Sequence, residues 1–179
     1  TFDHEWVKHQ IEDTTVEEVL IKNWPGLHIE PLQAPENMEV LIGWTGSPAS
    51  SPHFVSEVKR LKSDPSFYGD FLEDSHRCVE KLIHAFKTNN IKGVQKMVRQ
   101  NRTIIQRMDK EATVDIETEK LKYLCDIAEK YHGASKTSGA GGGDCGITII
   151  NKDVDKEKIY DEWTKHGIKP LKFNIYHGQ

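Results

Sequence analysis

Glycines, hydroxyl side chains and one lysine gather in residues 136–146, KTSGAGGGDCG, which hold five of the chain's 13 glycines. Glycines adopt backbone angles that other residues avoid, and consecutive main-chain N–H groups can form a concave site for an anion. Lys136 adds a cation, while Thr137 and Ser138 add two hydroxyl donors. The stretch is therefore predicted to be a phosphate-handling loop.

A flexible connector is the alternative interpretation of these glycines. Linkers are polar at both ends, whereas this stretch runs directly into the β-branched run Ile147–Ile150, and it lacks the serine content of a Gly/Ser linker. It matches neither GxxxxGK[ST] nor GxGxxG followed by a helix. Asp144 closes the stretch and is expected to brace it, because a carboxylate that faces phosphates without a metal would repel them.

A second group of hydroxyls lies in residues 45–52, TGSPASSP, directly after an apolar run that is predicted to be a strand buried on both faces. Ser51 followed by Pro52 is a favourable N-cap and first residue of a helix. A helix N-terminus with free N–H groups and hydroxyls attracts an anion. Ordinary turn and cap chemistry explains the same residues equally well, and both interpretations stay open for Ser51.

The elements that must position these two segments are helices grouped between strands, which favours an α+β layer over alternating βαβ units. The glycine-rich stretch is expected between a helix that ends at Gly133 and a strand. The predicted strands are 27–32, 38–44, 146–150 and 171–176. The predicted helices are a stretch within 1–24, one along Phe54–Leu61, 67–89, 91–108, one that Asp115 caps and Gly133 ends, and 154–165.

Composition is that of an ordinary soluble protein: 179 residues, 36% hydrophobic, 29% charged and a net charge of −4. The slight acidity gives no support for nucleic-acid binding, and no apolar run approaches the roughly 18 residues of a membrane span. No signal peptide is recognised, and the three cysteines have no CxxC spacing, so a cytoplasmic location is expected. The chain begins at Thr1 with no cap or turn before it, which suggests a piece of a longer protein.

Titratable residues outside the two segments offer no metal or catalytic pattern. The nine histidines are scattered without HxxxH or HExxH, so no metal site is predicted. Cys78 and Cys125 are interpreted as small core residues. Solvated faces or helix-start charges are the interpretation of the acidic residues Glu117, Glu119, Asp153, Asp155 and Glu157.

Together, the glycine-rich stretch and the upstream segment resemble a known family. KTSGAGGGDCGI at residues 136–147 resembles the third conserved motif of the GHMP small-molecule kinases. Within that family, the DCG ending, with GWT at 43–45 and ASS at 49–51, is similar to the bacterial phosphomevalonate kinases. The resemblance runs along essentially the whole chain and covers only the C-terminal half of such an enzyme.

The resemblance implies a fold and a division of the chain. Residues 1–25 would be the tail end of the N-terminal kinase domain with a connecting helix. Residues 26–179 would form the GHMP kinase C-terminal domain, an α+β domain with a ferredoxin-like antiparallel sheet layered with helices.

The resemblance also implies a reaction: ATP-dependent phosphorylation of (R)-5-phosphomevalonate to the diphosphate, in the mevalonate pathway of isoprenoid biosynthesis. ATP and Mg²⁺ would be bound mainly by the missing N-terminal half, because the Pro-x-x-x-Gly-Leu-Gly-Ser-Ser-Ala loop of the family is not in this sequence. The catalytic carboxylate is expected upstream of Thr1, so this chain alone is expected to be inactive. The implied substrate- and phosphate-binding residues are Ser50, Ser51, Lys136, Ser138, Gly139, Ala140, Gly141 and Gly142.

Two alternatives remain. The first is another enzyme of the same family, mevalonate kinase or diphosphomevalonate decarboxylase, against which the Asp144-Cys145 ending and the serine-rich segment weigh. The second is a non-catalytic α+β ligand-binding or interaction module whose glycines form only a connector.

Overall fold

The structure, a computed structural model, describes residues 3–48, 61, 64–139 and 141–173. The chain divides into two compact units, Thr1–Leu32 and Gln33–Gln179. The division into a kinase-domain tail at 1–25 and a second domain at 26–179 stays a prediction. In the described part of the chain, no helix is long and apolar enough to cross a membrane.

The first unit contains two helices where the sequence predicts one helical stretch. They are α1 (His4–Asp13) and α2 (Val16–Leu20). They are separate because Thr15 adopts an extended backbone and begins α2 with a capping box, in which its hydroxyl accepts from the N–H of Glu18. Within α2, Val19 is the buried residue, and its carbonyl accepts a 2.8 Å hydrogen bond from the indole of Trp24.

The strand predicted at 27–32 is wrong, since these residues have no regular secondary structure and are all exposed. Among the residues that the structure describes, no strand lies beside them to complete a ladder of hydrogen bonds. Pro31 also lacks the N–H that a ladder needs.

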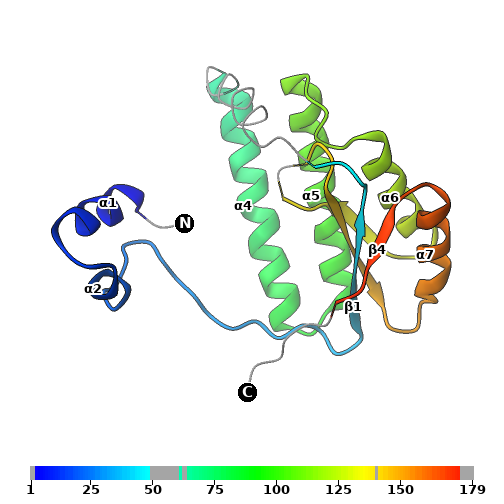
Figure 1. Cartoon of the computed structure of the whole chain (residues 1–179), viewed down its shortest axis with the longest axis horizontal. Coiled ribbons are helices and arrows are strands. Elements are labelled where there is room, and N and C mark those ends of the chain that lie inside the picture. The colour runs from blue at the N-terminus through cyan, green and yellow to red at the C-terminus, as the bar shows by residue number, and fades with distance from the viewer. Residues whose placement is uncertain (1–2, 49–60, 62–63, 140, 174–179) are drawn as a thin grey trace. The chain divides into compact units, whose positions relative to one another are not determined.

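The second unit is built on a four-stranded sheet in the order β2-β3-β1-β4, with every pair antiparallel. This all-antiparallel sheet, layered with helices, confirms the predicted α+β class and ferredoxin-like sheet (Figure 1). The strands are β1 (Met38–Trp44), β2 (Ala134–Thr137), β3 (Cys145–Asn151) and β4 (Lys169–Leu171).

Two strands differ from the prediction. Strand β2 was not predicted, because Ala-Ser-Lys-Thr has no apolar alternation and becomes a strand by pairing with β3. The last strand starts two residues before the predicted Leu171, and Lys172 and Phe173 lie outside it. The remainder of that predicted strand, 174–176, lies outside the described residues.

Four long helices accompany the sheet, close to their predicted positions: α4 (Pro65–Lys87), α5 (Ile91–Ala112), α6 (Glu119–Lys130) and α7 (Lys156–Lys165). Thr118, not the predicted Asp115, caps α6, and its hydroxyl accepts from the N–H of Leu121. After α6 the left-handed residue is His132, with φ 61°, one position before the predicted Gly133. Of the helix predicted along 54–61, only Leu61 is described, and it is helical and buried.

The sheet is covered on both faces, as predicted for β1 (Figure 1). On one face, Leu41 and Ile150 pack with Trp163 of α7 and with α6. On the other face, Ile149 packs with Val94 and Val98 of α5. These two layers fix the strand ends that carry the predicted loop.

Two facing glycines near the ends of the two central strands allow α6 to approach closely. Gly43 of β1 is paired with Gly146 of β3, and a Cβ added to either glycine would lie 2.6 Å from the Leu124 side chain. The indole of Trp163 donates a 3.1 Å hydrogen bond to the Leu124 carbonyl and holds this turn of α6 in place. The N-terminal end of α6 is therefore fixed close to the ends of β1 and β3.

Gly146→Ala is expected to lower the free energy of unfolding by roughly 1–3 kcal/mol, because the methyl group overpacks against Leu124. Chemical denaturation measures this change. The matched control is Gly69→Ala in α4, where an added Cβ meets nothing within 4 Å and the exchange should stabilise the helix by about 0.5–1 kcal/mol. Equal effects at the two positions would contradict this account of the packing.

Candidate functional site

The stretch between β2 and β3, residues 138–144 and here called the glycine loop, has an unusual backbone. Gly141, Gly142, Gly143 and Asp144 follow one another with φ of 80°, 75°, 129° and 58°. A side-chain-bearing residue in the left-handed region costs about 1–2 kcal/mol, so the conformation requires glycine at most of these positions. The glycines therefore give this loop a specific conformation, whereas the alternative of a simple connector would need only flexibility.

One side of the glycine loop packs on Ile116, which lies just before α6. The N–H of Gly142 donates a 2.7 Å hydrogen bond to the carbonyl of Ile116. A Cβ added to Gly141 would lie 2.3 Å from the Ile116 side chain and 2.5 Å from its carbonyl oxygen. Gly141 is therefore required both by its φ and by the space available.

The other side of the glycine loop is bound to the turn at residues 45–47, here called the β1 turn. The N–H of Thr45 donates to the carbonyl of Asp144 at 2.8 Å, and the N–H of Asp144 donates to the carbonyl of Ser47 at 2.6 Å. A Cβ on Gly143 would lie 2.9 Å from that same Ser47 oxygen. The two segments singled out in the sequence, about 90 residues apart, thus meet at one end of the sheet.

Asp144 braces the loop as expected, although its main chain and not its carboxylate makes the two bonds to the β1 turn. The carboxylate accepts a long contact, 3.7 Å, from the Cys145 thiol. Burial, followed by the Asp144 charge, raises the pKa of the Cys145 thiol, so this cysteine is held in its neutral form.

The main-chain donors of the glycine loop fall into two groups. Those of Ser138, Gly142 and Asp144 are used within the fold. Within the described part of the chain, no acceptor receives the N–H groups of Gly139, Gly141 and Gly143. These three N–H groups are therefore candidate donors to an anion.

Lys136 lies in β2 and not in the loop, which corrects the predicted boundary. Its pairing with Ile147 places it in the sheet, where its ammonium donates a 2.8 Å hydrogen bond to the carbonyl of Thr137. Burial lowers the pKa of Lys136, because it disfavours the charged ammonium. Burial also disfavours the charged form of the Cys125 thiol and so raises its pKa to about 11. A role for Lys136 in phosphate binding stays a prediction.

The other predicted site residues are partly described. Ser138 is half-buried and Gly139 is exposed. Ser50, Ser51 and Ala140 lie outside the described residues, so their proximity to the loop stays a prediction.

Lys120 is a cation near the site that sequence reasoning missed. It lies in the first turn of α6, and its ammonium donates a 2.9 Å hydrogen bond to the carbonyl of Thr45 in the β1 turn. No local pattern connects residues 75 positions apart, so only the packing of α6 on the sheet reveals this contact.

A buried ion pair supports the segment on which the glycine loop packs. Arg102 of α5 bonds both carboxylate oxygens of Glu117, and only 13% and 6% of these two side chains is exposed. Glu117 was predicted to lie on a solvated face or to be a helix-start charge; the solvated face is wrong, while Glu117 does lie directly before the N-cap Thr118 of α6. The carboxylate of Asp109 accepts from the N–H groups of Ile116 and Glu117, at 2.9 and 3.1 Å.

The charge of Arg102 is maintained inside this brace. Burial opposes the charge, but the hydrogen bonds to Glu117 and Asp126 outweigh it and raise the pKa of the guanidinium. The Asp126 bond is 2.9 Å long. Arg102 therefore stays charged, and its bonds to Glu117 help to hold the segment that contains Ile116 against the glycine loop.

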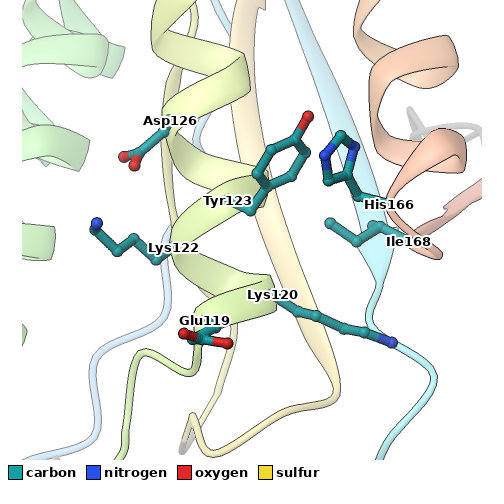
Figure 2. A pocket seen from close by; sticks show the side chains of 7 residues that line it. All are labelled: Glu119, Lys120, Lys122, Tyr123, Asp126, His166 and Ile168. Carbon is teal, nitrogen blue, oxygen red and sulfur yellow. The ribbon is translucent and has the colours of Figure 1, made fainter.

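A depression of about 420 Å³ is lined by residues of α6 and by His166 and Ile168, which follow α7 (Figure 2). Its wall includes a stack of Tyr123 on His166, with ring centroids 3.6 Å apart. Lys120 and Lys122 both line it, and the figure shows their side chains pointing in different directions. Elsewhere in the described residues, as here, no group of three His, Cys, Asp or Glu side chains could hold a metal ion.

Glu117→Gln is expected to lower the free energy of unfolding by roughly 3 kcal/mol, because it removes the buried charged partner of the Arg102 guanidinium and leaves only the more exposed carboxylate of Asp126. Chemical denaturation at neutral pH measures the loss. Glu111→Gln, at an exposed position in the last turn of α5, is the control and should change stability by no more than about 0.5 kcal/mol. If Glu117→Gln lowered the free energy of unfolding as little as Glu111→Gln, the Arg102–Glu117 pair would not stabilise this segment.

Comparison with known proteins gives consistent matches. The family described as GHMP kinases C terminal matches residues 82–169. The phosphomevalonate kinase of a Streptomyces strain is 32% identical over 93% of this chain, which covers 48% of that protein. The chain therefore spans about half the length of this relative.

Two solved structures extend the match. A Listeria innocua protein is 39% identical with a TM-score of 0.87, over 97% of this chain and 49% of that one. Phosphomevalonate kinase from Streptococcus pneumoniae, in complex with phosphomevalonate and AMPPNP, is 27% identical with a TM-score of 0.78, over 96% of this chain and 49% of that one.

Proposed function

The chain contains a GHMP kinase C-terminal domain, and from that premise we propose that it supplies the C-terminal half of a phosphomevalonate kinase active site. The reaction is ATP-dependent phosphorylation of (R)-5-phosphomevalonate to the 5-diphosphate in the mevalonate pathway. The observation that carries the proposal is the glycine loop, bonded on one side to Ile116 and on the other to the β1 turn. The proposed location is the cytoplasm.

Phosphoryl transfer needs mainly positioning and charge stabilisation. The bond from the γ-phosphorus to the ADP oxygen breaks, and a bond forms to a phosphate oxygen of phosphomevalonate. We assign the N–H groups of Gly139, Gly141 and Gly143, with the hydroxyl of Ser138, to the oxygens of these phosphates. These groups are preorganised by the left-handed backbone, so they need no rearrangement when charge develops.

The remaining parts of the site are proposed from the resemblance. Ser50 and Ser51 would contact the acceptor phosphate, and Lys136 and Ala140 would complete the pocket. From the same resemblance we assign Mg²⁺ and most ATP contacts to an N-terminal half. When bound, Mg²⁺ would neutralise charge on the transferring phosphates.

Steady-state kinetics of the complete protein that contains this chain would identify the substrate. Turnover with ATP is expected for phosphomevalonate, with little or none for mevalonate or diphosphomevalonate. The chain by itself is expected to have no activity in the same assay. Turnover of mevalonate alone, or ATP-dependent decarboxylation of diphosphomevalonate, would instead favour one of the alternative enzymes.

Gly141→Val in the complete protein is expected to lower kcat/KM by about 10²-fold or more, the scale for loss of a charge-stabilising donor. Valine is strained at φ 80° and collides with Ile116, so the loop must move. Ser138→Ala tests the hydroxyl without backbone strain and should give a loss of similar scale.

Gly69→Ala in α4, where an added Cβ meets nothing within 4 Å, is the control and should leave kcat/KM unchanged. If both loop variants retained full activity while remaining folded, the loop would be only a connector and the proposal would fail.

A further inference from the structure

Lys120 holds an unusual place in α6. It is the second residue of the helix, where the macrodipole disfavours a positive charge by about 0.3–1 kcal/mol. Its ammonium does not point freely into solvent but reaches the carbonyl of Thr45, at 2.9 Å. A residue that opposes its local preference and is held by a distant contact is a candidate for a functional role.

The acceptor of this bond, Thr45, is the residue through which the β1 turn is connected to the glycine loop. Its N–H donates to Asp144, and Asp144 in turn donates to Ser47. Lys120, Thr45, Asp144 and Ser47 therefore form a continuous series of three hydrogen bonds that runs from α6 to the glycine loop.

The side chain of Thr45 contributes packing to the turn but no hydrogen bond within the described residues. Thr45 is 1% exposed, and its buried hydroxyl has no hydrogen-bond partner among the residues that the structure describes. Gly46, the next residue, has φ 85° and adds no side chain to the packing. The position of the Thr45 peptide thus depends on its two main-chain bonds, one to Asp144 and one to Lys120.

We infer that Lys120 is a positioning residue of the phosphate site: its ammonium holds the β1 turn against the glycine loop. The inference rests on the proposed function for its catalytic consequence, but its structural part is independent of the reaction. It gives Lys120 a role that neither Lys136, bonded within β2, nor Lys122, on the same helix, can perform.

The test compares three variants of the complete protein. Lys120→Met keeps the length of the side chain and removes the donor, Lys120→Arg keeps a charged donor, and Lys122→Met removes a neighbouring charge that has no side-chain bond to the turn. Hydrogen exchange at the amides of Thr45 and Asp144 is measured first. We expect exchange about tenfold faster in Lys120→Met, because a hydrogen bond from a charged group contributes about 1.5 kcal/mol.

The kinetic readout separates positioning from general stability. Lys120→Met is expected to lower kcat/KM for phosphomevalonate about tenfold, with a thermal midpoint close to that of the unchanged protein. Lys120→Arg should recover most of this loss, and Lys122→Met should show none. Equal effects of Lys120→Met and Lys122→Met, or a loss of activity with unchanged exchange at Thr45 and Asp144, would overturn the inference.

The two proposals fail separately. Faster exchange in Lys120→Met, in a protein that turns over no phosphomevalonate, would support the positioning contact and reject the proposed function. Normal turnover with unchanged exchange and unchanged kcat/KM in Lys120→Met would support the function and reject the contact.

Discussion

The left-handed backbone of Gly141–Asp144 is the constraint on which the rest of the site depends. A chain can adopt this conformation only where the Cβ is absent or tolerated, and here it donates one N–H to Ile116 and another to Ser47. The surroundings are built to hold it: Ile116 occupies the space beside Gly141, and Ser47 lies against Gly143. Such strain persists only where the neighbouring structure fixes it, which is the usual condition of a ligand-binding loop.

The neighbouring structure fixes the loop through two different kinds of interaction. On the side of α5, the buried Arg102–Glu117 pair and the Asp109 carboxylate hold the segment that ends in Ile116. On the side of the sheet, apolar packing of Leu124 against two facing glycines brings α6 to the strand ends. The charged groups thus fix the orientation of the Ile116 segment, because hydrogen bonds form only in a narrow range of angles. Apolar packing fixes the distance between α6 and the sheet.

Much of the fold could be predicted from local patterns. The strand at Met38–Trp44 and the long helices α4 and α5 carry strong periodicity, so their existence and approximate limits follow from hydrophobic spacing. The strand 134–137 could not be predicted, because Ser135 and Lys136 resemble a polar loop until β3 supplies their hydrogen bonds. For the same reason the alternation at 27–32 predicted a strand, although these residues pair with no strand in the described part of the chain.

The sequence by itself determined the chemistry that this protein can offer: the glycines that permit a left-handed loop, the hydroxyl-rich segment after a buried strand, and the motif that resembles the GHMP kinases. Tertiary structure decided which charged groups take part. It placed Lys136 in a strand, buried Glu117 under Arg102, and brought Lys120 to the carbonyl of Thr45. The physical reason is that backbone conformation follows from local sterics, whereas the partner of a charge depends on which distant segments the core packs together.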